Sequence, residues 1–165
     1  MLFIIILLQH FTAMLAHTHV VIGLAVGLYL KEFTQTLAPE STFIYYAVLL
    51  IASILPDIDH RGSTLNRTLT ITKVIPWFFK HRGIFHSAWP LLIGATVLLF
   101  FVPVAGIAYF IGYTSHLLTD SLTKAGVNWL YPSNFKIRGP LHTGGIGETA
   151  LFLFFTGLTV LKIIF

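Results

Sequence analysis

The distribution of apolar and polar positions divides the chain into alternating long runs. Apolar runs cover residues 14–30, 42–56, 87–102, 104–122 and 149–165, and two long polar segments cover residues 57–86 and 123–148. Most runs are slightly shorter than the ~20 residues that cross a hydrocarbon core, a difference that bilayer thinning or snorkelling can absorb. The pattern predicts an all-α fold, a single membrane-embedded domain over residues 1–165 with about five spans.

Two helix boundaries follow from individual residues. Pro103 separates the third run from the fourth, because proline removes an internal helical hydrogen bond and clashes with the preceding turn. Ser87 is a candidate N-cap of the third helix, and Pro90 is tolerated in its first turn. Pro56 favours an extended exit from the second run rather than a continued helix.

The first 13 residues, MLFIIILLQHFTA, are apolar but too short to form a further span. They lack the positively charged start of a secretory signal peptide. Two interpretations stay open: an interfacial extension of the first helix, or an upstream start with Met14 as the working start.

Composition agrees with a membrane protein. The chain of 165 residues is 56% hydrophobic and 10% charged, and its mean hydropathy is +0.84. Soluble domains are usually about 25% charged. The chain has no cysteine, which excludes disulfides and thiolate metal ligands.

The basic residues are distributed asymmetrically. Alternating spans would place both long polar segments on the same side of the membrane, and an excess of Lys and Arg marks the cytoplasmic side. Eight of the ten basic residues lie in these segments: Arg61, Arg67, Lys73, Lys80, Arg82, Lys124, Lys136 and Arg138. We therefore expect both segments to be cytoplasmic. Nucleic-acid binding is not expected, because no aromatic-basic pattern accompanies these charges.

Most histidines and carboxylates fall at this same end of the predicted spans. His116 and Asp120 are four residues apart and share a helical face, as a ligand pair or as a structural hydrogen-bonded pair. An ionisable residue inside a membrane span is a functional hypothesis by default. Asp57 and Asp59 close the second run, where a polar helix terminus is the alternative interpretation.

Small residues indicate which histidines face the bundle interior. Gly23 and Gly27 follow His19 at steps of four, and Ala108 and Gly112 precede His116 at the same step. Such stripes let membrane helices approach closely. His19 and His116 are therefore expected to face inward. As a candidate metal ligand, His19 is favoured over His17.

Imidazole and carboxylate ligands without thiolate suit Zn, Mn or Fe, and their number is sufficient for one or two divalent ions. Zn is favoured. A structural site needs only four closed ligands, so a larger set beside basic residues favours open positions for water and an anionic substrate.

Several motifs together resemble the YdjM-like family of bacterial inner-membrane proteins, which is described as metal-dependent hydrolases. The matching stretches are THVVIG, LPDIDH, HRGIFHS, GYTSHLLTD, AGVNWLYP and TGGIGE, in family order from Thr18 to Glu148. The resemblance implies metal-binding roles for eight residues: His19, Asp57, Asp59, His60, His81, His86, His116 and Asp120.

The expected activity is hydrolysis of a phosphoester, such as a phospholipid or lipid-linked phosphate, with a metal-activated water. Asp59 is a candidate catalytic residue. Arg82, Arg61 and Arg138 are candidates to hold phosphate oxygens, although the positive-inside rule alone also explains them. Glu148 is a further ligand or base, or it complements the dipole of the last helix. A metal transporter or a non-catalytic metal-binding membrane protein is the alternative function.

Overall fold

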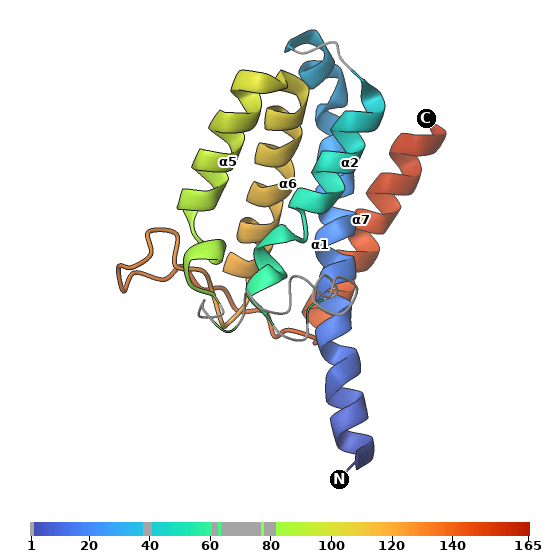
Figure 1. Cartoon of the computed structure of the whole chain (residues 1–165). Coiled ribbons are helices and arrows are strands. Elements are labelled where there is room, and N and C mark those ends of the chain that lie inside the picture. The colour runs from blue at the N-terminus through green and yellow to red at the C-terminus, as the bar shows by residue number, and fades with distance from the viewer. Residues whose placement is uncertain (1, 38–40, 61–62, 64–76, 78–81) are drawn as a thin grey trace.

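The computed structural model describes residues 2–37, 41–60, 63, 77 and 82–165. Five longer helices in these ranges form a bundle (Figure 1): α1 (Leu2–Leu37), α2 (Thr42–Ala52), α5 (Ala88–Phe101), α6 (Pro103–Ser121) and α7 (Ile146–Ile164). Two short 3₁₀ helices, η1 (Leu55–Asp59) and η3 (Ile84–His86), lie between α2 and α5. Within the described ranges no strand occurs, only two isolated β-bridges. The all-α prediction is confirmed for this part of the chain.

Helix boundaries follow local chemistry. Ser87 caps α5 and its hydroxyl accepts a hydrogen bond from the Trp89 N–H, as expected from the sequence. Pro103 occupies the first turn of α6, where its missing N–H costs nothing. The exit from α2 is not the extended segment predicted from Pro56. Instead Pro56 stands in the first turn of η1, because proline is also compatible with a helix start.

Helix α6 is the centre of the bundle and packs against α1, α2 and α5. Small residues permit these approaches. A Cβ on Gly112 would lie 2.4 Å from the Leu49 carbonyl oxygen of α2, and one on Gly23 would lie 2.0 Å from the Ser53 Oγ. Both predicted stripes of small residues therefore mark close helix contacts.

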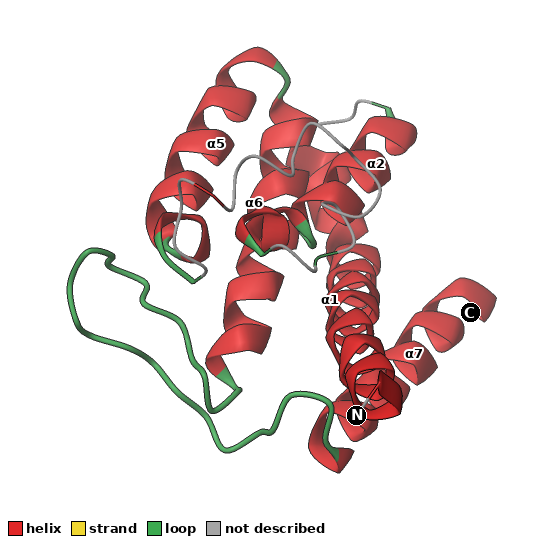
Figure 2. Ribbon diagram, turned by 60° about the horizontal axis from the view of Figure 1, so that its bottom comes forward, coloured by secondary structure: helices red, strands yellow, loops and turns green. Residues whose placement is uncertain are grey.

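The described parts of the two long connections lie at the same end of the bundle. Figures 1 and 2 show η1 and η3, from the first connection, and the segment between α6 and α7 at the end opposite the α5–α6 turn. The placement of the whole of residues 57–86 and 123–148 on the cytoplasmic side stays a prediction. Helix α1 begins at Leu2, so residues 2–13 continue the first helix and project beyond the other helices (Figure 1).

Among the described helices, α7 is long and apolar enough to cross a membrane by length and composition. Helices α2 and α5 are apolar but have 11 and 14 residues, fewer than the ~20 of a full span. Large apolar side chains are nevertheless exposed on the outer faces of α5 and α7, including Phe100, Phe101 and Phe154. Five membrane spans therefore remain a prediction.

Candidate metal centre

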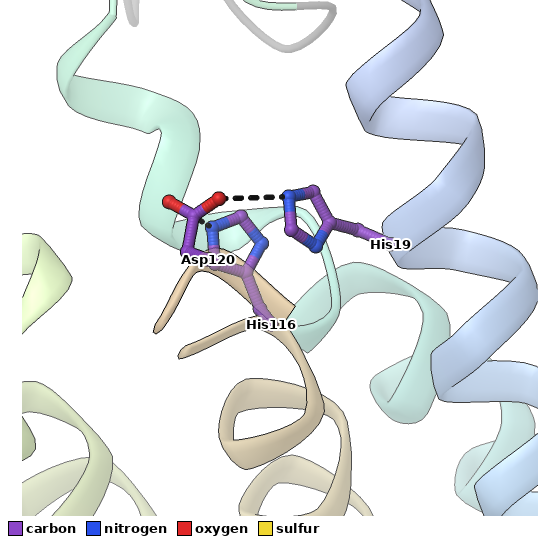
Figure 3. A group of neighbouring side chains, drawn as sticks. All are labelled: His19, His116 and Asp120. Atoms are coloured by element: carbon purple, nitrogen blue, oxygen red, sulfur yellow. Dashed lines mark ion pairs between the residues drawn. The ribbon is translucent and has the colours of Figure 1, made fainter. Parts of the chain in front are cut away.

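Four separate elements bring five imidazole and carboxylate side chains together. His19 comes from α1, Asp57 from η1, His86 from η3, and His116 and Asp120 from the last turns of α6. All except Asp57 are buried, and Asp57 is partly exposed. In Figure 3 His19, His116 and Asp120 point toward one another from α1 and α6.

Four donor atoms form a closed ring, which we call the donor ring. Starting from Asp57 Oδ1, it runs 3.5 Å to His86 Nε2, 3.6 Å to Asp120 Oδ2, 4.0 Å to His116 Nε2 and 3.8 Å back to Asp57 Oδ1. These distances are too long for hydrogen bonds. They are slightly longer than the edge of about 3.3 Å in a tetrahedron with Zn–ligand bonds of 2.0–2.1 Å. Within the ring, the donor atoms of Asp57, His86 and His116 all lie within 4.8 Å of one another and could hold a divalent cation.

His19 extends the donor ring on one side. Its Nε2 lies 3.5 Å from Asp120 Oδ1, and its ring stacks on that of His116 with centroids 3.8 Å apart. Asp120 thus directs one carboxylate oxygen to His19 and the other to the donor ring. Two overlapping groups, His19–His116–Asp120 and Asp57–His86–His116, could each hold a metal ion.

The imidazole of His116 is held from behind by the backbone. Its Nδ1 lies 2.8 Å from the carbonyl oxygen of Ser53, the residue that ends α2. A carbonyl only accepts, so Nδ1 carries the hydrogen and Nε2 presents its lone pair to the donor ring. This second contact is the usual support of a metal-binding histidine. Nε2 has no hydrogen-bond partner among the described residues.

The carboxylate of Asp59 supports His86 in the same way. Asp59 Oδ2 lies 3.1 Å from His86 Nδ1 and accepts a hydrogen bond from the Arg82 N–H, also at 3.1 Å. The structure therefore places Asp59 behind His86 rather than in either donor group. Its position suits orientation of a ligand. The ligand and catalytic roles expected of Asp59 from the sequence stay predictions.

Charge in the donor ring depends on these contacts. Burial opposes ionisation of Asp57, but His116, His86 and His19 outweigh it and hold the pKa of Asp57 well below its usual value. Burial also opposes protonation of His86, but the nearby carboxylates of Asp57, Asp59 and Asp120 outweigh it and raise its pKa to about 9. The ring therefore favours an ionised Asp57 carboxylate and a positively charged His86. A metal ion would replace the proton of His86.

Arg82 lies beside the donor ring and supplies further positive charge. Its Nη2 lies 3.0 Å from Asp120 Oδ2, and its Nη1 donates to the Gly126 carbonyl at 2.8 Å. Its φ of 59° is in the left-handed region, which is uncommon outside glycine. This backbone conformation accompanies an N–H contact to Asp59 and a side-chain contact to Asp120.

Two further predicted residues, Glu148 and His60, belong to neither donor group. Glu148 is buried at the start of α7, where its carboxylate accepts from the Thr18 hydroxyl at 3.0 Å and from the Gly144 N–H. It thereby joins α7 to α1 and caps the start of α7. His60 is partly buried at the end of η1 and belongs to neither donor group. His81 and Arg61 lie outside the described residues.

Sequence reasoning separated His17 from His19 but missed the backbone support. His19 is buried beside the donor ring, whereas His17 is exposed on another face of α1. The Ser53 carbonyl carries no sequence signal, because every residue has one. Thr123 and Gly126 were also missed, and both accept hydrogen bonds from Arg82.

Comparisons with known proteins agree with this arrangement of motifs. A family model described as "YdjM inner membrane protein" matches residues 14–164. The chain is 34% identical to "Inner membrane protein YdjM" of Escherichia coli (strain K12) over 138 residues, which cover 78% of this chain and 70% of that protein. It is also 34% identical to "Uncharacterized protein YvsG" of Bacillus subtilis (strain 168) over 115 residues, or 67% of this chain and 70% of that protein. No solved structure matches significantly. The chain belongs to the YdjM inner membrane protein family.

Proposed function

We propose that this chain is a multi-pass inner-membrane hydrolase that depends on one or two divalent ions, with Zn²⁺ favoured over Mn²⁺ and Fe²⁺. Its substrate is a phosphoester, such as a phospholipid or lipid-linked phosphate. The observation that carries the proposal is the closed ring of two imidazole nitrogens and two carboxylate oxygens at 3.5–4.0 Å. The names of the family and of its Escherichia coli member support the inner membrane as its location.

The residues divide into three roles in this proposal. Asp57, His86 and His116 hold the first ion, with Asp120 Oδ2 beside them, and His19 with the second oxygen of Asp120 adds a ligand for it or for a second ion. A divalent cation in such a site lowers the pKa of water and stabilises negative charge on phosphoryl oxygens. Asp59 orients His86, and the Ser53 carbonyl fixes the tautomer of His116.

Arg82 is the candidate phosphate-binding residue. Its guanidinium lies at the edge of the donor ring, and part of its side chain reaches solvent. Arginine binds phosphate oxygens with two parallel N–H groups. A metal ion at Asp120 would balance the charge of that carboxylate, which would leave the Arg82 guanidinium to bind a phosphate oxygen. Glu148, in contrast, joins α1 to α7 and takes no part in the chemistry.

The placement at one end of the bundle favours hydrolysis over transport. The donor ring lies at the end that contains both long connections, and the basic residues of these connections make that end cytoplasmic by the positive-inside rule. A transporter places its binding groups near the bilayer midplane, between its repeats. A site at the membrane surface suits a lipid head group.

The test measures metal content and hydrolysis in the same preparation. The purified full chain in detergent is stripped with chelator, reloaded with Zn²⁺ or Mn²⁺, and assayed for phosphate or head-group release from phosphatidic acid and phosphatidylglycerol. We expect metal-dependent release that His116→Ala abolishes and His17→Ala leaves unchanged. Tight metal binding without release from any phosphoester would reject the hydrolase in favour of the metal-binding or transport alternative.

A further inference from the structure

A second site lies on the other face of α6, in an apolar groove between α1, α6 and α7. The groove has a volume of about 590 Å³, within the ~300–1,000 Å³ of small-molecule sites. Its walls are apolar side chains: Val26 and Leu30 of α1, Phe110 and Leu118 of α6, and Phe155 of α7. The proposed hydrolysis uses none of them.

The groove extends along the helix axes. On α6 it is lined from Phe110 to Leu122, twelve steps along the helix or about 18 Å at 1.5 Å per residue. This is more than half of a hydrocarbon core of about 30 Å. Such a shape matches one extended hydrocarbon chain lying parallel to the helices.

One end of the groove is basic. Arg138 lines it beside Leu122, at the same end of α6 as Asp120. The side chain of Arg138 also packs on Gly126, where a Cβ would lie 2.4 Å from the Arg138 Cγ. The Gly126 carbonyl accepts from Arg82, which contacts Asp120. Contacts through Gly126 and Arg82 thus connect the basic end of the groove to the donor ring.

We propose that this groove binds one hydrocarbon chain of an anionic membrane lipid, with the lipid phosphate against Arg138. The apolar walls suit a hydrocarbon chain, and the guanidinium of Arg138, exposed at one end of the groove, is complementary to a lipid phosphate. The inference rests on the proposed function, for which it identifies the substrate class as an anionic lipid. Gly126, which contacts both arginines, then lies between the phosphate-binding Arg138 and Arg82.

The experiment labels the groove directly. The full chain in detergent, with metal removed, is irradiated with phosphatidic acid that carries a diazirine on its acyl chain, and labelled peptides are mapped by mass spectrometry. Diacylglycerol with the same chains is the neutral comparator. We expect labels on the α1, α6 and α7 residues of the groove and stronger labelling by phosphatidic acid.

Two pairs of exposed positions provide matched variants. Leu118→Trp fills the groove, whereas Leu153→Trp adds the same ring on α7 outside it. Arg138→Gln should weaken labelling by phosphatidic acid about tenfold, as expected for loss of a charged hydrogen bond, and Lys136→Gln should not. Equal labelling of the two tryptophan variants, or of the two glutamine variants, would overturn the proposal. A dimer that Leu118→Trp disrupts, without lipid labelling, would also overturn it.

This readout is independent of hydrolysis. A chain that is labelled in the groove but releases nothing from any phosphoester would retain the lipid site and reject the proposed hydrolase. A chain that hydrolyses soluble phosphoesters but shows no groove labelling would retain the hydrolase and reject the lipid site.

Discussion

His86 lies between two carboxylates, with Nδ1 3.1 Å from Asp59 and Nε2 3.5 Å from Asp57. The two contacts differ in kind, because the first has hydrogen-bond length and the second does not. The imidazole is therefore fixed on one side and presents its other nitrogen to the donor ring. This relationship separates a residue that orients a ligand from one that binds the ion.

Asp59→Asn should weaken metal binding without abolishing it. The change removes the charge behind His86 and disturbs its orientation, a loss that typically costs about 10–100-fold in metal affinity. Competition of the purified protein with a Zn²⁺ indicator measures the affinity. Glu32→Gln, an exposed change on α1 at the other end of the bundle, is the control. An affinity equal to that of the unmodified chain would contradict the orienting role.

Asp120→Asn should be more severe. The two oxygens of Asp120 face His19 on one side and His86 and His116 on the other. Replacing the carboxylate by an amide therefore removes an anionic ligand that all three histidines share. We expect a loss in Zn²⁺ affinity of more than about 100-fold, beyond the range for orienting residues, and no hydrolysis. The circular dichroism spectrum in detergent should stay helical. Full metal content and full hydrolysis would show that the pair is only a structural contact.

The two histidines near the start of the family match should differ. His19→Ala removes a buried imidazole that stacks on His116, whereas His17→Ala changes an exposed position. Metal content per chain, measured by elemental mass spectrometry, should fall for the first variant and not for the second. Equal losses would place both imidazoles among the ligands.

Gly112→Ala should destabilise the bundle. Its Cβ would lie 2.4 Å from the Leu49 carbonyl oxygen, so α6 must move from α2, at a cost of about 1–3 kcal/mol for overpacking. Gly157→Ala on α7 is the matched control, because nothing lies within 4 Å of its Cβ. Thermal unfolding in detergent should show a lower midpoint for the first variant alone. Equal midpoints would contradict the close approach of α2 and α6.

Orientation in the membrane can be tested with single cysteines, since the chain has none. Asn134 is exposed in the connection between α6 and α7, and Ser41 is exposed at the opposite end of the bundle. On intact cells a membrane-impermeant thiol reagent should label Ser41→Cys and spare Asn134→Cys until the membrane is permeabilised. The reverse result would place the donor ring outside the cytoplasm.

Helix positions and close contacts were predictable from the sequence because they depend on local spacing. The four-residue steps of small residues, the His116–Asp120 pair and the Ser87 cap all follow from helix geometry. The side-chain partners were not predictable in this way. Glu148 contacts Thr18, and Arg82 contacts Asp120, only after segments distant in sequence meet. The positive φ of Arg82 also has no signature in its residue type.

The order in which the chain is made gives the donor ring another property. Its members come from α1, η1, η3 and α6, so the ring closes only after almost three quarters of the sequence has emerged and folded back on α1. Metal that binds this assembled ring but not the unfolded chain stabilises the fold, by about 2.7 kcal/mol at a concentration 100 times the dissociation constant. In the proposed metal-bound form, the ion would therefore stabilise only those chains in which all four elements have come together.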